Sequence, residues 1–481
     1  MFAVYLVLLR FAYLLFYRFW NTPLADIPGP RFAAATGLWV MYKEFTRQRR
    51  KWIHDLHLRY GPVVRIGPEE VSFATWDSLK EIYVSGGSGY DKTSFYRLFD
   101  NFDTQCMFST LEKTSHGETK KKFSDRYNKM FIMQPHIAEG IREHAEEFIM
   151  KCTEKPGAAV DIYVYLHCYA LDCITHHVFD PHGLHSLTSP SDVVAMKELS
   201  YYDALKTSYF NYYFPELYFV VTRVLKLFSI SFYDRSSGVI TSYIKKMVGR
   251  TDVSSYTVLE KLQEQKEPLP NVYIASECMD HTVAGIDTTG DALCFLLYQL
   301  SLPSSSAIQE KLHAELSQSS SEPVDNLVYL DAVVKEGLRC FTPIPMSLPR
   351  LVPKGGTTIE GFRLPENTIV SCQAYTLHRL DTKVFPNPEE FRPERWLDAE
   401  GAIDRNQLFF AFAAGGRGCI GKHLALLEMK VLLKEVYSTY WTRVAPEMTG
   451  SMEMNDQIMS TRPKDQICLL TFENSGCNCC K

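Results

Sequence analysis

The chain has 481 residues, of which 46% are hydrophobic, and a formal net charge of −5. This length allows a large buried core, and the near balance of charges without a long basic run argues against a nucleic-acid partner. The 13 cysteines are scattered in mostly apolar surroundings, which argues against a disulfide framework and is typical of a reduced, cytosol-facing protein.

The chain opens with an apolar and aromatic segment, residues 1–20, that Arg10 and Arg18 interrupt. A membrane-spanning helix needs about 20 apolar residues, so the segment predicts a short membrane anchor, with a helix lying in the interface as the alternative. A signal peptide fits less well because no small-residue cleavage site follows. Residues 21–30 are instead a proline-rich hinge, and Arg18 beside it favours a cytosolic catalytic domain over residues 31–481.

Two shorter patterns predict elements on either side of the chain's middle. Residues 56–68 indicate the end of a helix followed by a hairpin of two strands. Residues 330–339 predict a helix apolar enough to be buried, with Glu336 and Arg339 on one face because residues three apart are neighbours there. An exposed pair of this kind contributes only about 0.3–0.5 kcal/mol, whereas a buried pair needs further partners.

A long apolar pattern over residues 272–300 predicts a helix that ends near Pro303. Residues 284–289, Ala-Gly-Ile-Asp-Thr-Thr, lie midway along it. A carboxylate and hydroxyls inside an apolar helix are costly unless they are bonded or used. One interpretation is that Thr288 bonds back to a carbonyl one turn earlier; the other is a functional role for Asp287 and Thr288.

A glycine-rich loop near the C-terminal end, residues 412–421, carries the most informative cysteine. The glycines allow tight turns and the close approach of a flat ligand, and residues 422–433 predict an amphipathic helix directly after the loop. The amide N–H groups at the start of that helix, together with Arg417, favour the thiolate form of Cys419. A thiolate is a soft ligand suited to iron.

The same loop also fits a dinucleotide-binding pattern, G-x-G-x-x-G at residues 416–421, with residues 408–412 as the preceding strand. Too few residues follow to complete a two-halved dinucleotide fold. No acidic residue stands about 20 residues further on to bind a ribose. A surface loop with a buried structural cysteine is a further alternative.

The loop resembles the heme-binding signature of the cytochrome P-450 monooxygenases, F-x-x-G-x-R-x-C-x-G. The matching positions are Phe412, Gly415, Arg417, Cys419 and Gly421. Three more motifs of the family follow the family's order: residues 284–289 match A/G-G-x-D/E-T-T/S, residues 336–339 match E-x-x-R, and residues 393–396 read P-E-R-W. Nearly the whole chain is similar to fungal P-450 enzymes of secondary metabolism.

The resemblance implies a mainly α fold with small β-sheets, in which heme b lies between two long helices and Cys419 ligates its iron. It implies cofactor contacts at Cys419, Arg417, Arg350, His116, Lys120, Phe412, Gly415, Gly421, Ala284 and Gly285. Members of the family carry W-x-x-x-R or H-x-x-x-R on an early helix. Here His116 and Lys120 stand at these positions, so the charge is kept but the forked geometry of arginine is lost.

The resemblance also assigns roles within the protein. Glu336, Arg339 and Arg395 are expected to form a structural triad that fixes the loop of Cys419. Asp287 and Thr288 are expected to deliver protons for the cleavage of dioxygen, a contribution of about 10²–10⁴-fold in rate.

The expected activity is the insertion of one oxygen atom from O2 into an apolar substrate by hydroxylation, epoxidation or oxidative coupling. The family's substrate contacts fall near residues 90–108, around Ala284 and at residues 343–348. A P-450-like isomerase or dehydratase that works without a reductase is the alternative within the family. A nucleotide-binding membrane protein is the alternative outside it. Residues 317–322 form a shorter connection than the family usually has.

Electrons are expected from NADPH through a membrane-bound NADPH–cytochrome P-450 reductase, since the chain has no room for a flavin or nicotinamide domain. Basic residues could supply the docking surface for it: Lys120, Lys121, Lys122, Lys422 and Lys430. The expected location is the endoplasmic reticulum membrane, with a single span and the catalytic domain on the cytosolic side.

Overall fold

The computed structural model describes residues 22–227, 238–319 and 322–475, and before residue 22 it describes only residues 5, 10 and 13. The predicted anchor over residues 1–20 therefore lies outside the described residues apart from these three positions. Within the described ranges, no helix combines the length and the apolar character that crossing a membrane requires.

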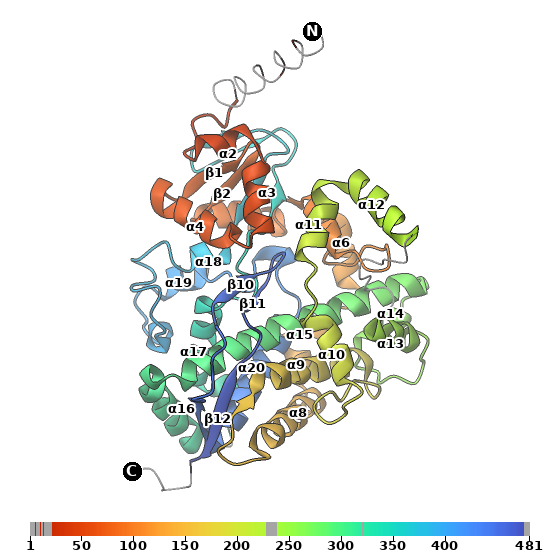
Figure 1. The fold of residues 1–481 in the computed structure, drawn as a ribbon, viewed down its shortest axis with the longest axis vertical. Coiled ribbons are helices and arrows are strands. Elements are labelled where there is room, and N and C mark those ends of the chain that lie inside the picture. The colour runs from red at the N-terminus through yellow and green to blue at the C-terminus, as the bar shows by residue number, and fades with distance from the viewer. Residues whose placement is uncertain are drawn as a thin grey trace.

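Helices form most of the described chain and surround small sheets, which confirms the predicted fold class (Figure 1). The helices of the first half are α2 (Arg31–Ala35), α3 (Leu38–Phe45), α4 (Arg49–Tyr60), α5 (Trp76–Leu79), α6 (Lys113–Lys121), α7 (Lys129–Ile132), α8 (Pro135–Thr153), α9 (Ile162–Phe179), α10 (Val193–Ser200), α11 (Leu205–Tyr213) and α12 (Pro215–Leu227). Those of the second half are α13 (Val239–Val248), α14 (Val258–Gln263), α15 (Asn271–Ser301), α16 (Ser306–Gln318), α17 (Val328–Cys340), α18 (Ala374–Leu377), α19 (Ala402–Leu408) and α20 (Lys422–Thr439).

The long helix α15 crosses the middle of the molecule, and α9 lies beside it (Figure 1). It begins after Pro270 and ends at Ser301, which confirms the prediction for residues 272–300 within a residue at each end. Most side chains of its C-terminal half are buried, with Leu293, Leu296 and Leu297 fully buried in the main core. A helix that is buried on most faces needs neighbours around it, so the rest of the helical body packs around α15.

The sheets are small and separate. Their strands are β1 (Val63–Gly67), β2 (Glu70–Phe73), β3 (Asp91–Lys92), β4 (Val160–Asp161), β5 (Arg350–Leu351), β6 (Thr357–Ile359), β7 (Phe362–Leu364), β8 (Ile369–Cys372), β9 (Tyr440–Val444), β10 (Met454–Asp456), β11 (Thr461–Pro463) and β12 (Leu469–Asn474). In Figure 1, β1 and β2 lie near one end of the molecule, β12 near the other, and β10 and β11 in the middle. The largest sheet has the order β1-β2-β8-β5-β3. In it β1 and β2 form the antiparallel hairpin predicted after α4, and β2 and β8 run parallel.

Two further predictions about single elements are confirmed. α20 begins directly after the glycine-rich loop, as the amphipathic pattern from residue 422 indicated. Between α16 and α17 the described residues contain only the short 3₁₀ helix η7 (Val324–Asn326), which agrees with the short connection in the sequence. The loop before α20 thus lies at the junction of the helical body and the large sheet, where the predicted site residues meet.

Candidate active site

The glycine-rich loop runs from the end of α19 at Leu408 to the start of α20 at Lys422. Residues 409–412, all of which are described, form no strand, so the strand that a dinucleotide site requires is missing and that interpretation of the loop is wrong. The backbone instead turns through the 3₁₀ helix η9 (Gly415–Arg417), two residues before Cys419.

The shape of the loop depends on Gly415 and on internal hydrogen bonds. The amide of Cys419 donates to the carbonyl of Phe412 over 2.9 Å, which closes the turn. Gly415 has a φ of +70°, and a Cβ there would lie 2.0 Å from the carbonyl oxygen of Tyr83, so only glycine fits. At Gly421 a Cβ would meet no atom within 4 Å. Open space is therefore left beside Gly421, two residues after Cys419.

Cys419 has solvent-accessible surface, yet protein atoms surround its thiol on most sides. These two observations together place the thiol against an interior space. Burial raises the pKa of this thiol, while the amides of Gly421 and Lys422 and the ammonium groups of Lys120 and Lys422 act in the opposite direction. The prediction that the loop alone favours the thiolate is thus not supported. A positively charged ligand atom is needed to complete the stabilisation.

Basic side chains from separate parts of the chain gather beside this loop. This basic cluster consists of Lys92, His116, Lys120, Arg350 and Arg417, all buried except Lys120, which is half-buried. Four of the five were predicted, and Lys92 was missed. Strands β3 and β5 place Lys92 directly opposite Arg350. Like charges in such a cross-strand pair destabilise the folded chain, so the cluster is unfavourable on its own.

Only part of this positive charge is compensated within the protein. Arg417 Nη2 lies 3.1 Å from Asp91 Oδ1, and its Nη1 donates to the Leu111 carbonyl over 2.7 Å. Lys120 donates to the carbonyl of Gly416 in the loop over 2.9 Å. Lys120 stands where the family has an arginine. It binds the loop through a hydrogen bond to a backbone carbonyl, without the forked geometry of a guanidinium.

The other four basic groups form no ion pair in the described part of the chain, although the charge of Asp280 acts on Lys92. Nε and Nη1 of Arg350 are buried and lack hydrogen-bond partners among the described residues. Burial and the charge of Lys92, then of Arg417, lower the pKa of His116 to about 2. Burial and the neighbouring Arg350 lower the pKa of Arg417 to about 10. A bound group with carboxylates would complete this site, and heme, with two propionates, fits it.

The predicted acid–alcohol pair lies on α15. The hydroxyl of Thr288 donates to the carbonyl of Ala284 over 2.7 Å, so the back-bonded arrangement considered from the sequence is present. Ala284 is exposed toward the same side, and Oδ1 of Asp287 is buried without a partner among residues the structure describes. Gly285 faces α9 instead, where a Cβ would lie 2.6 Å from Cγ1 of Ile174. Helix packing therefore explains this glycine, and its expected place beside the cofactor stays a prediction.

The predicted triad is confirmed as a buried ion cluster. Glu336 lies 2.9 Å from both Arg339 and Arg395, and the exposed fractions of the three side chains are 0%, 0% and 1%. Its carboxylate also accepts the amide of Arg392 and the indole N–H of Trp396, each over 2.9 Å. Every lone pair of Glu336 is thereby used, which is the condition under which a buried ion pair is tolerated.

One predicted surface residue is wrongly placed. Lys430 is 5% exposed and pairs with Asp325 Oδ1 at 3.2 Å and with Asp331 Oδ1 at 2.7 Å. It lies where α20 packs against α17, so it cannot contribute to a docking surface. Lys121 and Lys422 are exposed and remain available.

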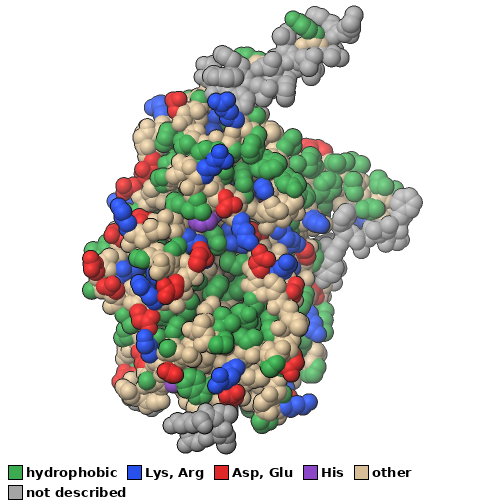
Figure 2. Space-filling model, turned by 60° about the vertical axis from the view of Figure 1, so that its left-hand side comes forward, with side chains coloured by type: hydrophobic (Ala, Val, Ile, Leu, Met, Phe, Trp, Pro, Cys, Tyr) green, Lys and Arg blue, Asp and Glu red, His purple; other side chains and the backbone are tan. Residues whose placement is uncertain are grey.

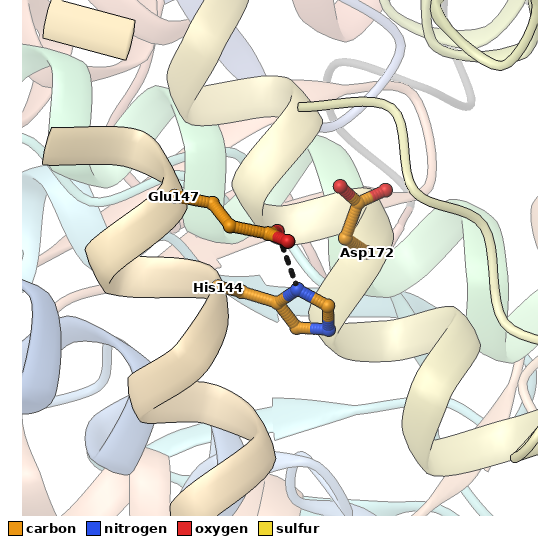
Figure 3. A group of neighbouring side chains, drawn as sticks. All are labelled: His144, Glu147 and Asp172. Carbon is orange, nitrogen blue, oxygen red and sulfur yellow. Dashed lines mark hydrogen bonds and ion pairs between the residues drawn. The ribbon is translucent and has the colours of Figure 1, made fainter. Parts of the chain in front are cut away.

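A second group of metal-binding residue types lies away from this site, between α8 and α9. Figure 3 shows His144, Glu147 and Asp172, whose ligand atoms lie within 4.8 Å of one another. The oxygens of Asp172 accept the amides of Ser186 and Leu187 over 2.7 and 2.9 Å, and His144 Nδ1 lies 3.1 Å from Glu147 Oε2. The bonds of Asp172 hold the loop after α9, and they give this carboxylate a structural role without an ion.

Comparisons with known proteins agree with this geometry. The family model Cytochrome P450 matches residues 27–469. The chain is 28% identical to "Cytochrome P450 monooxygenase ORF11" of Penicillium roqueforti, with 88% of this chain and 90% of the relative covered. It is 28% identical to "Cytochrome P450 monooxygenase stcB" of Emericella nidulans, with 94% and 89% covered. It is also 28% identical to "Pisatin demethylase" of Fusarium vanettenii, with 90% and 85% covered.

The accessible cysteine, the unbalanced basic cluster and the match over most of the chain point to one conclusion. The enzyme is a heme-thiolate monooxygenase of the fungal secondary-metabolism type, and the chain belongs to the cytochrome P450 family.

Proposed function

We propose that Cys419 is the axial ligand of the heme iron and that the basic cluster holds the heme propionates. Arg350 and Arg417 would bind the carboxylates in forked fashion, with Lys92, His116 and Lys120 adding charge or hydrogen bonds. When bound, the heme supplies the redox chemistry of dioxygen activation. The observation that carries this proposal is the buried positive charge near an accessible thiol, of which the described protein pairs only Arg417 with a carboxylate and leaves Nε and Nη1 of Arg350 without a hydrogen-bond partner.

Asp287 and Thr288 are proposed to deliver protons on the opposite side of the site. The hydroxyl of Thr288 donates to the Ala284 carbonyl, so its oxygen can accept a hydrogen bond from a proton carrier. The unpaired, buried Oδ1 of Asp287 can take up a proton and pass it on. α15 keeps both groups in place because its other faces are packed in the core.

The substrate is proposed to be an apolar, ring-bearing fungal metabolite. A cluster of buried side chains lies near the site and joins two of the predicted contact ranges to α11: Phe95, Tyr96, Leu205, Tyr209, Met346 and Met459. Edge-to-face rings within it, such as Phe95 and Tyr96 at 5.8 Å, suit contact with a flat hydrocarbon. Ligand sites are commonly lined this way, with few polar groups.

Electrons are proposed to arrive from NADPH through a reductase with an acidic face. Lys121 and Lys422 are exposed near the side of the loop that leads to Cys419. Complementary charge of this kind speeds association more than it adds affinity. Lys430 is excluded from this surface by its burial.

The enzyme is further proposed to act at the cytosolic face of the endoplasmic reticulum membrane, with residues 1–20 as a single-pass anchor. Figure 1 places α2 and α3 in the upper part of the view with α12 at the upper right, and Figure 2 shows hydrophobic side chains gathered over the upper part of the molecule. The exposed apolar residues there are Phe32, Leu38, Trp39, Tyr42, Leu217, Phe219, Val220 and Val224. Contiguous apolar surface of this kind suits contact with a lipid interface.

The purified enzyme, reconstituted with a P450 reductase, tests the proton-delivery role. Thr288→Ala should still consume NADPH but return most of the oxygen as hydrogen peroxide. Unchanged coupling would remove Thr288 from the mechanism. Metabolite profiles of a strain that lacks the gene identify the substrate, and accumulation of a polar precursor would contradict the apolar substrate class.

A further inference from the structure

A group of buried polar side chains lies behind the predicted acid–alcohol pair, on the side of α15 that faces α9. Asp291 stands one turn after Asp287 in α15, and His167 of α9 faces it, with its Nε2 3.4 Å from Asp291 Oδ1. His167 is 0% exposed and Asp291 3% exposed. α9 and α15 run side by side here (Figure 1), so the pair is enclosed by two helices of the core.

The orientation of the His167 ring is fixed. Its Nδ1 lies 2.8 Å from the carbonyl oxygen of Tyr163, which can only accept, so Nδ1 carries a hydrogen. The exchangeable proton of the ring is therefore on Nε2, the nitrogen that faces Asp291. Gly290 makes this position possible, because a Cβ there would lie 2.8 Å from Cδ2 of the ring.

The polar atoms of this group are poorly satisfied for a purely structural contact. His167 Nε2, Asp291 Oδ1 and Asp287 Oδ1 are all buried and have no well-aligned hydrogen bond to any residue that is described. A charge-assisted hydrogen bond is typically about 2.7–2.9 Å long, shorter than the 3.4 Å seen here. Unsatisfied buried groups call for an explanation such as a catalytic role or bridging water. The buried Glu336 cluster, by contrast, leaves no such atoms.

The surrounding charges keep a proton exchangeable between the two groups. Burial lowers the pKa of His167, but Asp291 and then Asp287 outweigh it, so the pKa is raised. Burial raises the pKa of Asp291 to about 6. Further groups that act on this pair are Tyr163 and Asp161 of the α9 region, Arg462 of β11 and Cys294 of α15.

We propose that His167 and Asp291 form a proton relay that resupplies Asp287. The inference rests on the proposed role of Asp287 and Thr288. Nε2 of His167 gives its proton to Asp291, Asp291 passes one to Asp287 along α15, and His167 regains a proton from solvent. Residues four apart on a helix have Cβ atoms about 5–6 Å apart, a gap that the carboxylates or one water can bridge. His167 acts through Asp291, so it is a positioning and relay residue.

The relay can be tested without a known substrate. During NADPH oxidation by the substrate-free enzyme with its reductase, each O2 leaves either as peroxide, after two electrons and two protons, or as two waters, after four electrons and four protons. Asp291→Asn and His167→Gln should raise the ratio of peroxide to water by about tenfold, less than the roughly 10²–10⁴-fold contribution of a group that transfers the proton itself, because the two residues act through Asp287. They should also increase the solvent deuterium isotope effect.

The matched control is His177→Gln. His177 is also buried in α9, at 1% exposure, but its ring faces Tyr127 with centroids 4.8 Å apart. This variant should keep the wild-type peroxide ratio and isotope effect. If it changes them as much as His167→Gln does, the effect comes from disturbing α9 and the relay is refuted.

A second readout needs no turnover. The infrared spectrum of the resting enzyme should show a carboxylic acid band that titrates near pH 6, disappears in Asp291→Asn and shifts in His167→Gln. Absence of a band that depends on Asp291 would overturn the proposal.

The turnover measurements separate the relay from the proposed function. If Asp291→Asn keeps the wild-type ratio of peroxide to water while Thr288→Ala is uncoupled, the relay is overturned and the proposed function stays intact. If Thr288→Ala stays coupled, the proposed function fails instead. Should His167→Gln not fold, Asp291→Asn alone decides.

Discussion

Two buried groups of charged residues in this enzyme contain arginines, and they differ in how the charge is balanced. Around Glu336, two guanidiniums meet one carboxylate that accepts five hydrogen bonds, all within the chain. In the basic cluster of five side chains, Arg417 is the one member with an ion-pair partner among the described residues, and that partner is Asp91. Burial of charge is tolerated only when it is compensated. The first group is complete without a ligand, and the second is complete only with an anionic one.

This difference separates residues that hold the fold from residues that hold the cofactor, although both groups follow motifs of the same family. A balanced group should respond to mutation by losing stability whether or not heme is bound. An unbalanced group should respond through heme binding. Three experiments can break or sharpen this comparison.

The largest effect is expected for Glu336→Gln. It leaves Arg339 and Arg395 buried without a counter-charge, and breaking a buried pair in this way costs about 3–5 kcal/mol. The free energy of unfolding, measured with urea, should fall by this amount, or the protein should fail to accumulate. Glu394→Gln is the control, because Glu394 forms an exposed pair with Lys311 that contributes only about 0–1 kcal/mol. Equal losses in the two variants would contradict the structural role of Glu336.

An effect of opposite sign is expected for Arg350→Met. In the heme-free protein the change removes one charge from a repulsive cluster and keeps the apolar stem, so the free energy of unfolding should stay equal or rise. Heme binding should weaken by about 1.5–3 kcal/mol, the range for a hydrogen bond to a charged group. The rate of heme transfer to a heme-scavenging protein measures this. The control is Arg443→Met, which removes an exposed pair with Glu473 and should change neither the free energy of unfolding nor heme binding. If Arg350→Met retains heme as well as the wild type does, the propionate contact is ruled out.

The smallest effect is expected in the pH dependence of stability. Burial, with Lys92 and Arg417 next, lowers the pKa of His116 from 6.5 to about 2 in the folded protein. As the pH falls below about 6.5, the unfolded chain binds this proton first, so the free energy of unfolding decreases by at most about 1.4 kcal/mol per pH unit. Bound propionates would raise this pKa and flatten the slope.

Other buried histidines, such as His57, His177 and His378, also have lowered pKa values. They lie outside the basic cluster, so their contribution to the pH dependence of the free energy of unfolding should be the same with or without heme. The difference between the two slopes therefore isolates His116 and should vanish in His116→Gln. Identical slopes for wild-type protein with and without heme would contradict an anionic group beside His116.

Local patterns predicted much of the fold and most of the site. The bounds of α15 follow from prolines at both ends, Pro270 and Pro303, around an apolar run. Arg350 and Arg417 were found because short motifs surround them. Lys92 was missed because β3 is only two residues long and its partner strand lies far away in the sequence. Such a pairing leaves no periodic signal.

One error comes from tertiary packing. Lys430 looks like a surface lysine on an amphipathic helix, but Asp325 and Asp331 form ion pairs with it where α20 packs against neighbouring elements. Packing also adds a reason for Gly285 that the motif does not give, because the close approach of Ile174 requires a glycine there. One helix alone does not contain this information.

The most direct test of the central claim is the reduced spectrum with carbon monoxide of the wild-type enzyme beside Cys419→Ser. The account predicts the red-shifted Soret band of a thiolate-ligated heme in the wild type, and its loss in the variant although the variant remains folded. A red-shifted band that persists in Cys419→Ser, or a wild-type enzyme that binds no heme, would contradict it.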